Sequence, residues 1–327
     1  MSRGECDASL SGGNHMSPGK SPNAGHSIFE RLLNYAKEHR EDFNLLLFRY
    51  GIERLLYRLS ISPYADKFVL KSASLFLVWF GQNYRVTKDA DLLYSSPADV
   101  EHITVVFREL CEIDIDDVDG IVFMADSVRA VPIREEQEYG GIRVTLVGML
   151  HKARIPLQID VGFGDTITPS PERITFPTLL NTPAPKLLAY PRYTMVAEKL
   201  EAMVRLDIAN SRMKDFYDVW LLSKLFTFDG GTLCRAVNNT FKHRSTSIPR
   251  GLPFAFTDDF RKDAQKQAQW RAFVRKAKPD TVASKFDAVI YDIETFIMPV
   301  VEAVRQGQLL KLVWTQGGGW SKEPEDR

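Results

Sequence analysis

The chain has 327 residues, of which 44% are hydrophobic and 26% charged, a composition typical of a globular protein with one large or two ordinary domains. Its 42 Lys and Arg residues balance 42 Asp and Glu residues, so the formal net charge is zero. The protein as a whole therefore has no electrostatic attraction for nucleic acid or an anionic membrane. Binding of either kind would therefore need a local patch.

The chain has three cysteines, Cys6, Cys111 and Cys234. Because this number is odd and their spacing is not that of metal ligands, neither a disulfide framework nor a zinc site is indicated. No apolar run approaches the roughly 18 residues of a membrane-spanning helix. The N-terminus lacks the hydrophobic segment of a secretory signal. We therefore expect a cytoplasmic protein that does not bind a membrane.

The first residues, 1–27, are poor in apolar side chains and rich in turn formers, which predicts a disordered tail. Apolar spacing over 28–60 predicts core-packing helices that are kinked or divided at Gly51. Three arginines of this segment are expected on its solvent-exposed face: Arg49, Arg54 and Arg58.

The stretch 67–94 is the most informative part of the chain. It predicts a strand at 67–71, a small-residue turn (Ser72, Ala73, Ser74), a helix at 73–80 and a strand at 89–94. Asp89 and Asp91 are two residues apart on that strand, so they project from the same face.

Two carboxylates on one face at a strand edge suit Mg²⁺ (or Mn²⁺), which takes oxygen ligands together with substrate phosphates. The side chains of Arg85, Thr87 and Lys88 precede them and suit an anionic ligand. This combination indicates phosphate chemistry. The alternative is a solvated surface turn, as we expect for the acidic loop at 112–119.

Further strands and helices follow in the first half of the chain. The expected elements are a helix at 97–111 and strands at 121–124, 127–134, 141–149 and 153–162. Asp160 falls on the face opposite Ile155, Leu157 and Ile159, so it either meets solvent or points into a site. The proline-rich run 169–191 predicts an ordered connector and a domain boundary.

After the connector the pattern becomes helical. The expected helices cover 194–209 (with Thr194 as N-cap), 212–225, 230–241, 257–277 and 284–306, before a disordered tail at 316–327. We therefore predict an α/β (α+β) fold. Its core over 28–190 is a mixed β-sheet flanked by helices, and a mostly helical domain follows over 191–315.

Residues 235–285 contain twelve Lys or Arg against four Asp. This local excess fits either contacts to a nucleic-acid backbone or a lysine-rich solvated helix face. The sequence leaves both interpretations open.

Several motifs occur in a characteristic order. They are Leu70–Ser74, Arg85–Leu93, Gln158–Asp165, Tyr193–Arg205 and Ser211–Asp218. Together they resemble the nucleotidyltransferases of the AbiEii/AbiGii toxin family over roughly residues 65–225. The resemblance implies a DNA-polymerase-beta-like core followed by a helical domain. The best-known members are toxins of type IV toxin–antitoxin and phage-defence systems, and some add nucleotides to tRNA acceptor ends.

The resemblance also implies roles for single residues. Asp89 and Asp91 would hold the metals, with Asp160 as third carboxylate, acting either as a ligand or as general base. Lys199 would contact the nucleotide's phosphates, although such a lysine also fits the edge of an amphipathic helix. Asp215 would position Lys199, the nucleotide or the acceptor, and Asp218 lies on the same helix side.

The nucleotide-binding set implied by the resemblance is Ser72, Ser74, Arg85, Lys88, Lys199 and Lys214. One position departs from the superfamily, whose turn normally begins with glycine so that backbone N–H groups approach phosphate closely. This chain has Ser72–Ala73 there.

The expected function is metal-dependent transfer of an NMP from an NTP to an acceptor hydroxyl on RNA such as tRNA. The protein would act as a toxin restrained by a partner antitoxin. Two alternatives remain: a protein or small-molecule acceptor, or a degenerate fold that only binds nucleotide or nucleic acid.

Overall fold

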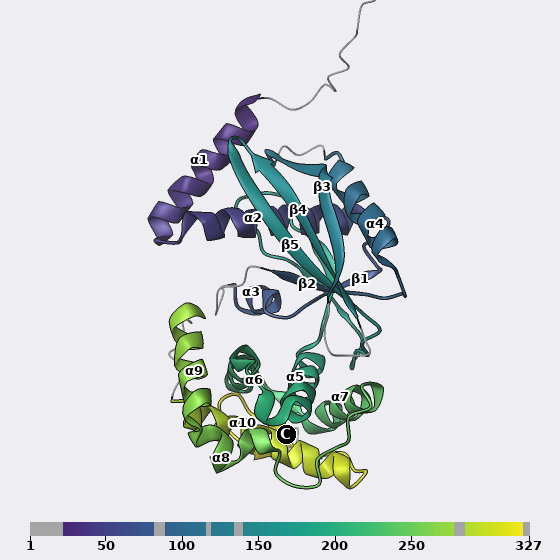
Figure 1. Ribbon diagram of the computed structural model, residues 1–327, viewed down its shortest axis with the longest axis vertical. Coiled ribbons are helices and arrows are strands. Elements are labelled where there is room, and N and C mark those ends of the chain that lie inside the picture. The colour runs from purple at the N-terminus through teal and green to yellow at the C-terminus, as the bar shows by residue number, and fades with distance from the viewer. Residues whose placement is uncertain (1–21, 82–88, 116–118, 134–139, 278–284, 323–327) are drawn as a thin grey trace, which may run out of the picture.

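A computed structural model describes residues 22–81, 89–115, 119–133, 140–277 and 285–322. The fold is mixed α/β, as predicted, with a seven-stranded sheet in one part and a group of helices in the other. Figure 1 shows the two parts one above the other, with α5 and α6 facing the sheet. None of the helices in the described ranges is both long and apolar enough to cross a membrane.

The chain opens with two helices, α1 (Pro22–His39) and α2 (Phe43–Ile61). The break between them lies before Asp42, whose side chain caps α2 by accepting from the Leu45 N–H at 3.0 Å. The prediction of a kink or division at Gly51 is wrong, because Gly51 lies inside continuous α2. A Cβ there would lie 2.9 Å from Leu157 Cδ2, so glycine allows α2 to approach the sheet closely.

The expected N-terminal tail also needs correction. Helix α1 already begins at Pro22, so part of the segment predicted as disordered is helical. The rest of that prediction, residues 1–21, lies outside the described residues.

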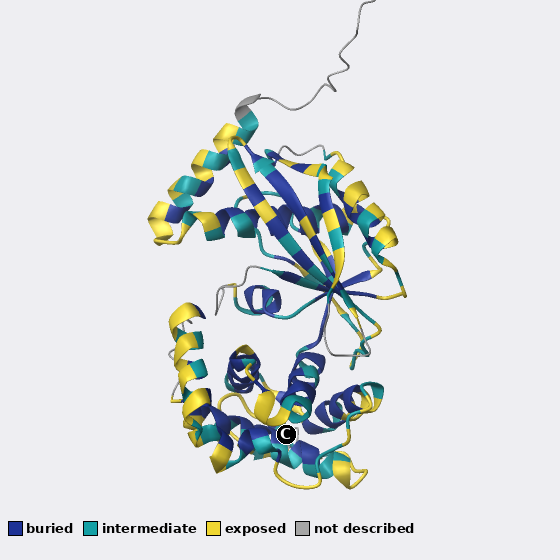
Figure 2. Ribbon diagram, in the orientation of Figure 1, coloured by how far each residue is buried: buried dark blue, intermediate teal, exposed yellow. Residues whose placement is uncertain are grey.

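Two arginines of α2 are buried rather than solvent-exposed as predicted. Arg54 Nε lies 3.1 Å and Arg58 Nη1 2.8 Å from Asp119 Oδ2, and Asp119 belongs to the acidic loop that we expected to be solvated. Most of α2 behind the sheet is buried (Figure 2). The sequence pattern missed this because the partner carboxylate is about sixty residues away.

The sheet has the order β3-β4-β5-β2-β1-β7-β6. Its strands are β1 (Phe68–Lys71), β2 (Ala90–Tyr94), β3 (Ile121–Ile133), β4 (Gly141–Leu150), β5 (Ala153–Phe163), β6 (Glu172–Thr175) and β7 (Lys186–Ala189). The pairs β2–β5 and β1–β7 are parallel and the others antiparallel.

The sheet differs from the prediction in two respects. The two strands expected between 121 and 134 form one strand with a register shift after Met124, and the proline-rich connector contributes β6 and β7.

Two further helices accompany the sheet, α3 (Ser74–Phe80) and α4 (Val100–Glu112). Apolar side chains of α1, α2 and α4 pack with the sheet in one hydrophobic cluster. Ala73 and Phe76 instead join a second cluster that belongs mainly to the helical part. The segment after β1 therefore packs against both parts of the molecule.

The helical part consists of α5 (Arg192–Leu206), α6 (Met213–Leu225), α7 (Gly230–His243), α8 (Asp258–Lys262), α9 (Ala264–Ala277) and α10 (Phe286–Arg305). Thr194 is not an N-cap, because α5 begins two residues earlier; its hydroxyl donates to the Thr168 carbonyl at 2.9 Å. The two hydrophobic clusters lie largely on either side of residue 190. The division into domains at 190–191 stays a prediction.

A small three-stranded sheet closes the helical part. It consists of β8 (Phe228–Asp229), β9 (Val313–Trp314) and β10 (Trp320–Ser321). The Trp320 indole packs on Phe296 with ring centroids 5.9 Å apart. Part of the segment 316–327 that was predicted to be disordered is therefore ordered, and 323–327 lie outside the described residues.

Candidate active site

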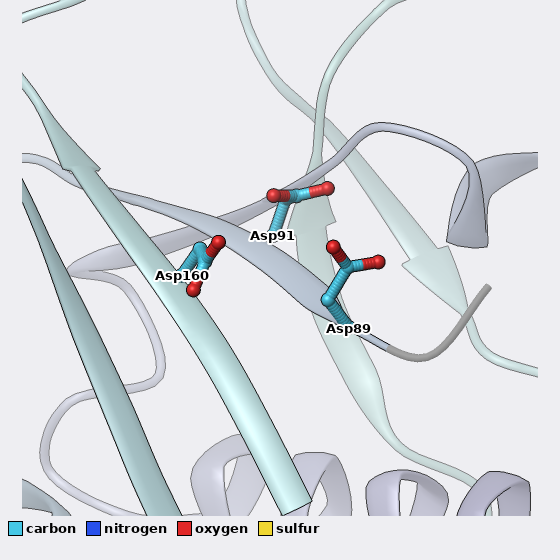
Figure 3. A group of neighbouring side chains, drawn as sticks. All are labelled: Asp89, Asp91 and Asp160. Atoms are coloured by element: carbon cyan, nitrogen blue, oxygen red, sulfur yellow. The ribbon is translucent and has the colours of Figure 1, made fainter. Parts of the chain in front are cut away.

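Three carboxylates meet where β2 and β5 run side by side. The parallel register places Asp91 opposite Asp160, and Asp89 immediately precedes β2. One ligand oxygen from each of the three side chains lies within 4.8 Å of the others. Figure 3 shows the three side chains gathered over these two strands. The structure thus brings together the three residues that the sequence singled out as metal ligands.

The chemistry of this group fits a divalent cation. Burial, followed by the negative charge of Asp89, raises the pKa of Asp91, while the charges of Lys71 and Lys214 oppose that rise. Crowded carboxylates of this kind gain from a dication, and carboxylate oxygens are the ligands that Mg²⁺ and Mn²⁺ prefer. Asp89, Asp91 and Asp160 would hold it.

Arg143 on β4 forms an ion pair with Asp160 on the neighbouring strand β5. Its Nε lies 2.9 Å from Asp160 Oδ1 and its Nη2 2.7 Å from Oδ2, a bidentate fork. Sequence reasoning missed Arg143. The alternation of β4 could have shown that Arg143 lies on the face opposite the apolar residues Ile142 and Val144. Its pairing with Asp160 could not be predicted, because it depends on strand register.

A cavity of about 420 Å³ separates the carboxylates from a cationic wall on α5 and α6. Lys199 and Lys214 of these helices and Arg212, just before α6, line that wall together with the carboxylates of Glu198 and Asp215. Phosphate groups bound in the cavity would therefore meet positive charge on the side facing the carboxylates.

Lys199 is held by two carboxylates of α6. Its Nζ lies 2.8 Å from Asp215 Oδ1 and 2.9 Å from Asp218 Oδ2, and both carboxylate side chains are fully buried. Burial alone would raise the pKa of Asp215, but the charges of Lys199 and Arg212 lower it to about 2. Asp215 is therefore ionised at neutral pH and forms an ion pair with Lys199. Its expected role in positioning Lys199 stays a prediction.

The turn after β1 keeps the backbone conformation expected of glycine. Ser72 has φ of +64°, in the left-handed region. It lines the cavity, and its side chain hydrogen-bonds to Asp91. Ser74 is buried in the first turn of α3 and is not among the residues lining the cavity. Arg85 and Lys88 lie outside the described residues.

A second group of charged residues, for which the sequence motifs predicted no role, lines the same cavity. It contains Lys71, Asp165, Glu198, Arg244 and the phenol of Tyr190. Burial would raise the pKa of Asp165, but Lys71 and Arg244 lower it to about 2. Burial raises the pKa of Glu198, a rise that the Lys71 charge opposes. Asp165 lies within a recognised motif, yet its partners come from other elements.

The solved structures similar to this chain include two proteins from Helicobacter pylori. JHP933 shares 14% sequence identity with a TM-score of 0.46, over 85% of this chain and 95% of its own. A candidate nucleotidyltransferase shares 13% identity with a TM-score of 0.45, over 86% of this chain and 99% of its own. Likenesses this distant carry no argument about function. A comparison with curated proteins finds no match.

The family comparison is more informative. The model described as "Nucleotidyl transferase AbiEii toxin, Type IV TA system" matches residues 54–291, well over half of the chain. This match confirms the resemblance seen in the sequence motifs, and it extends beyond the last motif to residue 291 of the helical part. The chain therefore belongs to the AbiEii family of toxins and is a nucleotidyltransferase.

Proposed function

We propose that this nucleotidyltransferase uses a divalent metal to transfer an NMP from an NTP to a hydroxyl of RNA, with tRNA as the acceptor. The observation that carries the proposal is the cavity between the carboxylate group of Asp89, Asp91 and Asp160 and the cationic wall of Lys199 and Lys214. Opposed anionic and cationic walls suit a metal-bound triphosphate.

In the proposed reaction, the acceptor hydroxyl oxygen forms a bond to the α-phosphorus of the NTP. The bond from that phosphorus to the bridging oxygen of pyrophosphate breaks, and the hydroxyl proton passes to solvent or to a carboxylate. Bound Mg²⁺ or Mn²⁺ would supply charge stabilisation for the attacking and leaving oxygens.

The chain's own residues bind and orient the nucleotide in this proposal. Lys199 and Lys214 donate to the triphosphate, and Asp215 and Asp218 hold Lys199 in place. The left-handed turn at Ser72 supports close approach of a phosphate to the backbone, the function that glycine serves in the superfamily.

Arg143 bears on the role of Asp160. Each Asp160 oxygen keeps a second lone pair while it accepts from Arg143, so a metal or a proton would share these oxygens with the guanidinium. Both roles of Asp160, ligand and general base, then remain open.

The family description supports a biological role as a toxin of a type IV toxin–antitoxin system. We propose that a cognate antitoxin restrains the protein in the cytoplasm and that the system acts in phage defence. Neighbouring genes and co-expression with the candidate antitoxin test this part independently of the chemistry.

The chemistry is tested by incubating the protein with total tRNA, Mg²⁺ and each NTP carrying label in its α-phosphate. Label entering RNA from one preferred NTP, lost in Asp89→Ala and in assays with EDTA, is the expected result. A matched control is Asp66→Ala, which removes an exposed carboxylate from the segment that leads into β1, away from the cavity.

Other results separate the alternatives. Pyrophosphate released without labelled RNA would move the acceptor to a protein or a small molecule. NTP binding with neither product would contradict the transferase proposal and indicate a fold that only binds nucleotide.

A further inference from the structure

We propose that Arg244 is a positioning residue that holds the two walls of the cavity at a fixed spacing. Arg244 directly follows α7 and meets three carboxylates. Its Nη2 lies 2.9 Å from Asp165 Oδ1 and 3.3 Å from Glu198 Oε1, and its Nη1 lies 3.0 Å from Glu201 Oε2. The arginine side chain is only 17% exposed, so solvent screens these contacts weakly.

The three carboxylates belong to different parts of the molecule. Asp165 follows β5, the strand that carries Asp160. Glu198 and Glu201 belong to α5, the helix that carries Lys199. Arg244 therefore links the strand of a proposed metal ligand to the helix of a proposed phosphate contact.

The network continues from Asp165 toward the carboxylate wall. Lys71 Nζ lies 3.1 Å from Asp165 Oδ2. Lys71 is the last residue of β1 and lies opposite Asp91 in the β1–β2 ladder. An unbroken chain of charged groups thus runs from α5 through Arg244, Asp165 and Lys71 to the strand of Asp91.

A guanidinium is suited to this role because its planar fork presents several donors at fixed angles. A lysine keeps the charge but offers one nitrogen, which reaches fewer of the three carboxylates. Arg244→Lys therefore separates the effect of geometry from the effect of charge.

Apart from the Tyr190 hydroxyl, which donates to Glu198 Oε1 at 3.2 Å inside the cavity, further contacts join the two parts through residues that do not line it. Thr168 exchanges hydrogen bonds with Thr194 and accepts from Asn239 Nδ2 at 3.0 Å, and Phe80 lies against Phe226 with ring centroids 5.1 Å apart. These contacts keep the parts attached when Arg244 is changed. The expected effect is thus a shift of one wall relative to the other.

The primary test measures the distance between the parts directly. Spin labels are placed at Val131→Cys on β3 and Tyr291→Cys on α10, two exposed positions, in a background with Cys6 and Cys111 replaced by serine. Double electron–electron resonance is then recorded for the parent protein, Arg244→Lys and Arg244→Met. We expect a broader or shifted distance distribution in Arg244→Met and a smaller change in Arg244→Lys.

The matched control is Arg261→Met, which removes an arginine of similar exposure, 15%, from ion pairs with Asp258 and Glu294 inside the helical part. It should leave the distance unchanged. Unchanged distances in both Arg244 variants, or an equal change in Arg261→Met, would overturn the proposal.

Kinetics supply a second readout. A misplacement of about 1 Å can cost roughly a hundredfold in rate. We expect kcat to fall at least about tenfold in Arg244→Met while KM for the NTP changes less than about threefold. A raised KM with unchanged kcat would instead make Arg244 a direct substrate contact. The distance measurement does not depend on activity, so it remains decisive if the proposed reaction fails.

Discussion

Replacing Lys199 by methionine tests the central contact of the cationic wall. Lys199 lies 2.8 Å from Asp215 and 2.9 Å from Asp218, two carboxylates whose side chains have no exposed surface. Removing one partner of a buried ion pair costs about 3–5 kcal/mol, because a buried charge loses a counter-charge. Arg212 Nε, 2.6 Å from Asp215 Oδ2, still faces one of the two carboxylates in this variant. Domains are commonly stable by only about 5–15 kcal/mol, so the loss should be conspicuous.

The assay is urea unfolding at pH 7, followed by circular dichroism. Lys199→Met should lower the free energy of unfolding by about 3 kcal/mol or more. The triple variant Lys199→Met, Asp215→Asn, Asp218→Asn removes the carboxylate charges as well and should recover a large part of that loss.

Two results would refute this reasoning. One is a loss of less than about 1 kcal/mol in Lys199→Met, the value typical of an exposed pair. The other is a triple variant that is less stable than the single variant, which would show that the buried charge is not the cause. Both variants should lack transferase activity. The triple variant should therefore regain stability without regaining activity, which distinguishes the two effects of Lys199.

Three further predictions concern other contacts. Arg143→Met frees both oxygens of Asp160, so Mn²⁺ measured by calorimetry should bind roughly ten- to a hundredfold more tightly, the equivalent of one charged hydrogen bond; weaker binding would show that Arg143 orients the carboxylate for the metal. The pKa of Asp215 is lowered from 3.8 to about 2, so the folded state releases this proton more readily than the unfolded chain. The resulting stability, roughly 2 kcal/mol, is present above about pH 4 and is lost as the pH falls toward 2. Across this pH range the free energy of unfolding, measured with urea, should change less with pH in Asp215→Asn than in the parent protein. Finally, Gly51→Val should lower the free energy of unfolding by about 1–3 kcal/mol, because a Cβ at this position meets Leu157 Cδ2 at 2.9 Å; an unchanged urea midpoint would mean that α2 moves away from the sheet without cost.

Local spacing in the sequence was enough to place several site residues. The alternation of a strand puts Asp89 and Asp91 on one face and puts Asp160 opposite the apolar side of its own strand. The helical spacing around Lys199 likewise gave α5 to within a few residues. These inferences succeed because the period of a strand or helix is a property of neighbouring residues.

Contacts between distant segments needed the tertiary structure. The spacing of Arg54 and Arg58 is typical of a solvent-exposed helix face, yet both side chains are buried and form ion pairs with Asp119. Arg143 and Arg244 belong to an outward strand face and a helix end, positions that in the sequence look like ordinary surface.

The sequence by itself determined the fold class, the family motifs and the candidate site residues Asp89, Asp91, Asp160 and Asp215. The tertiary structure decided that Arg143 meets Asp160 and that Lys199 meets Asp215. The physical reason is that charge pairing depends on strand register and on how helices pack against the sheet, and both bring together residues tens of positions apart.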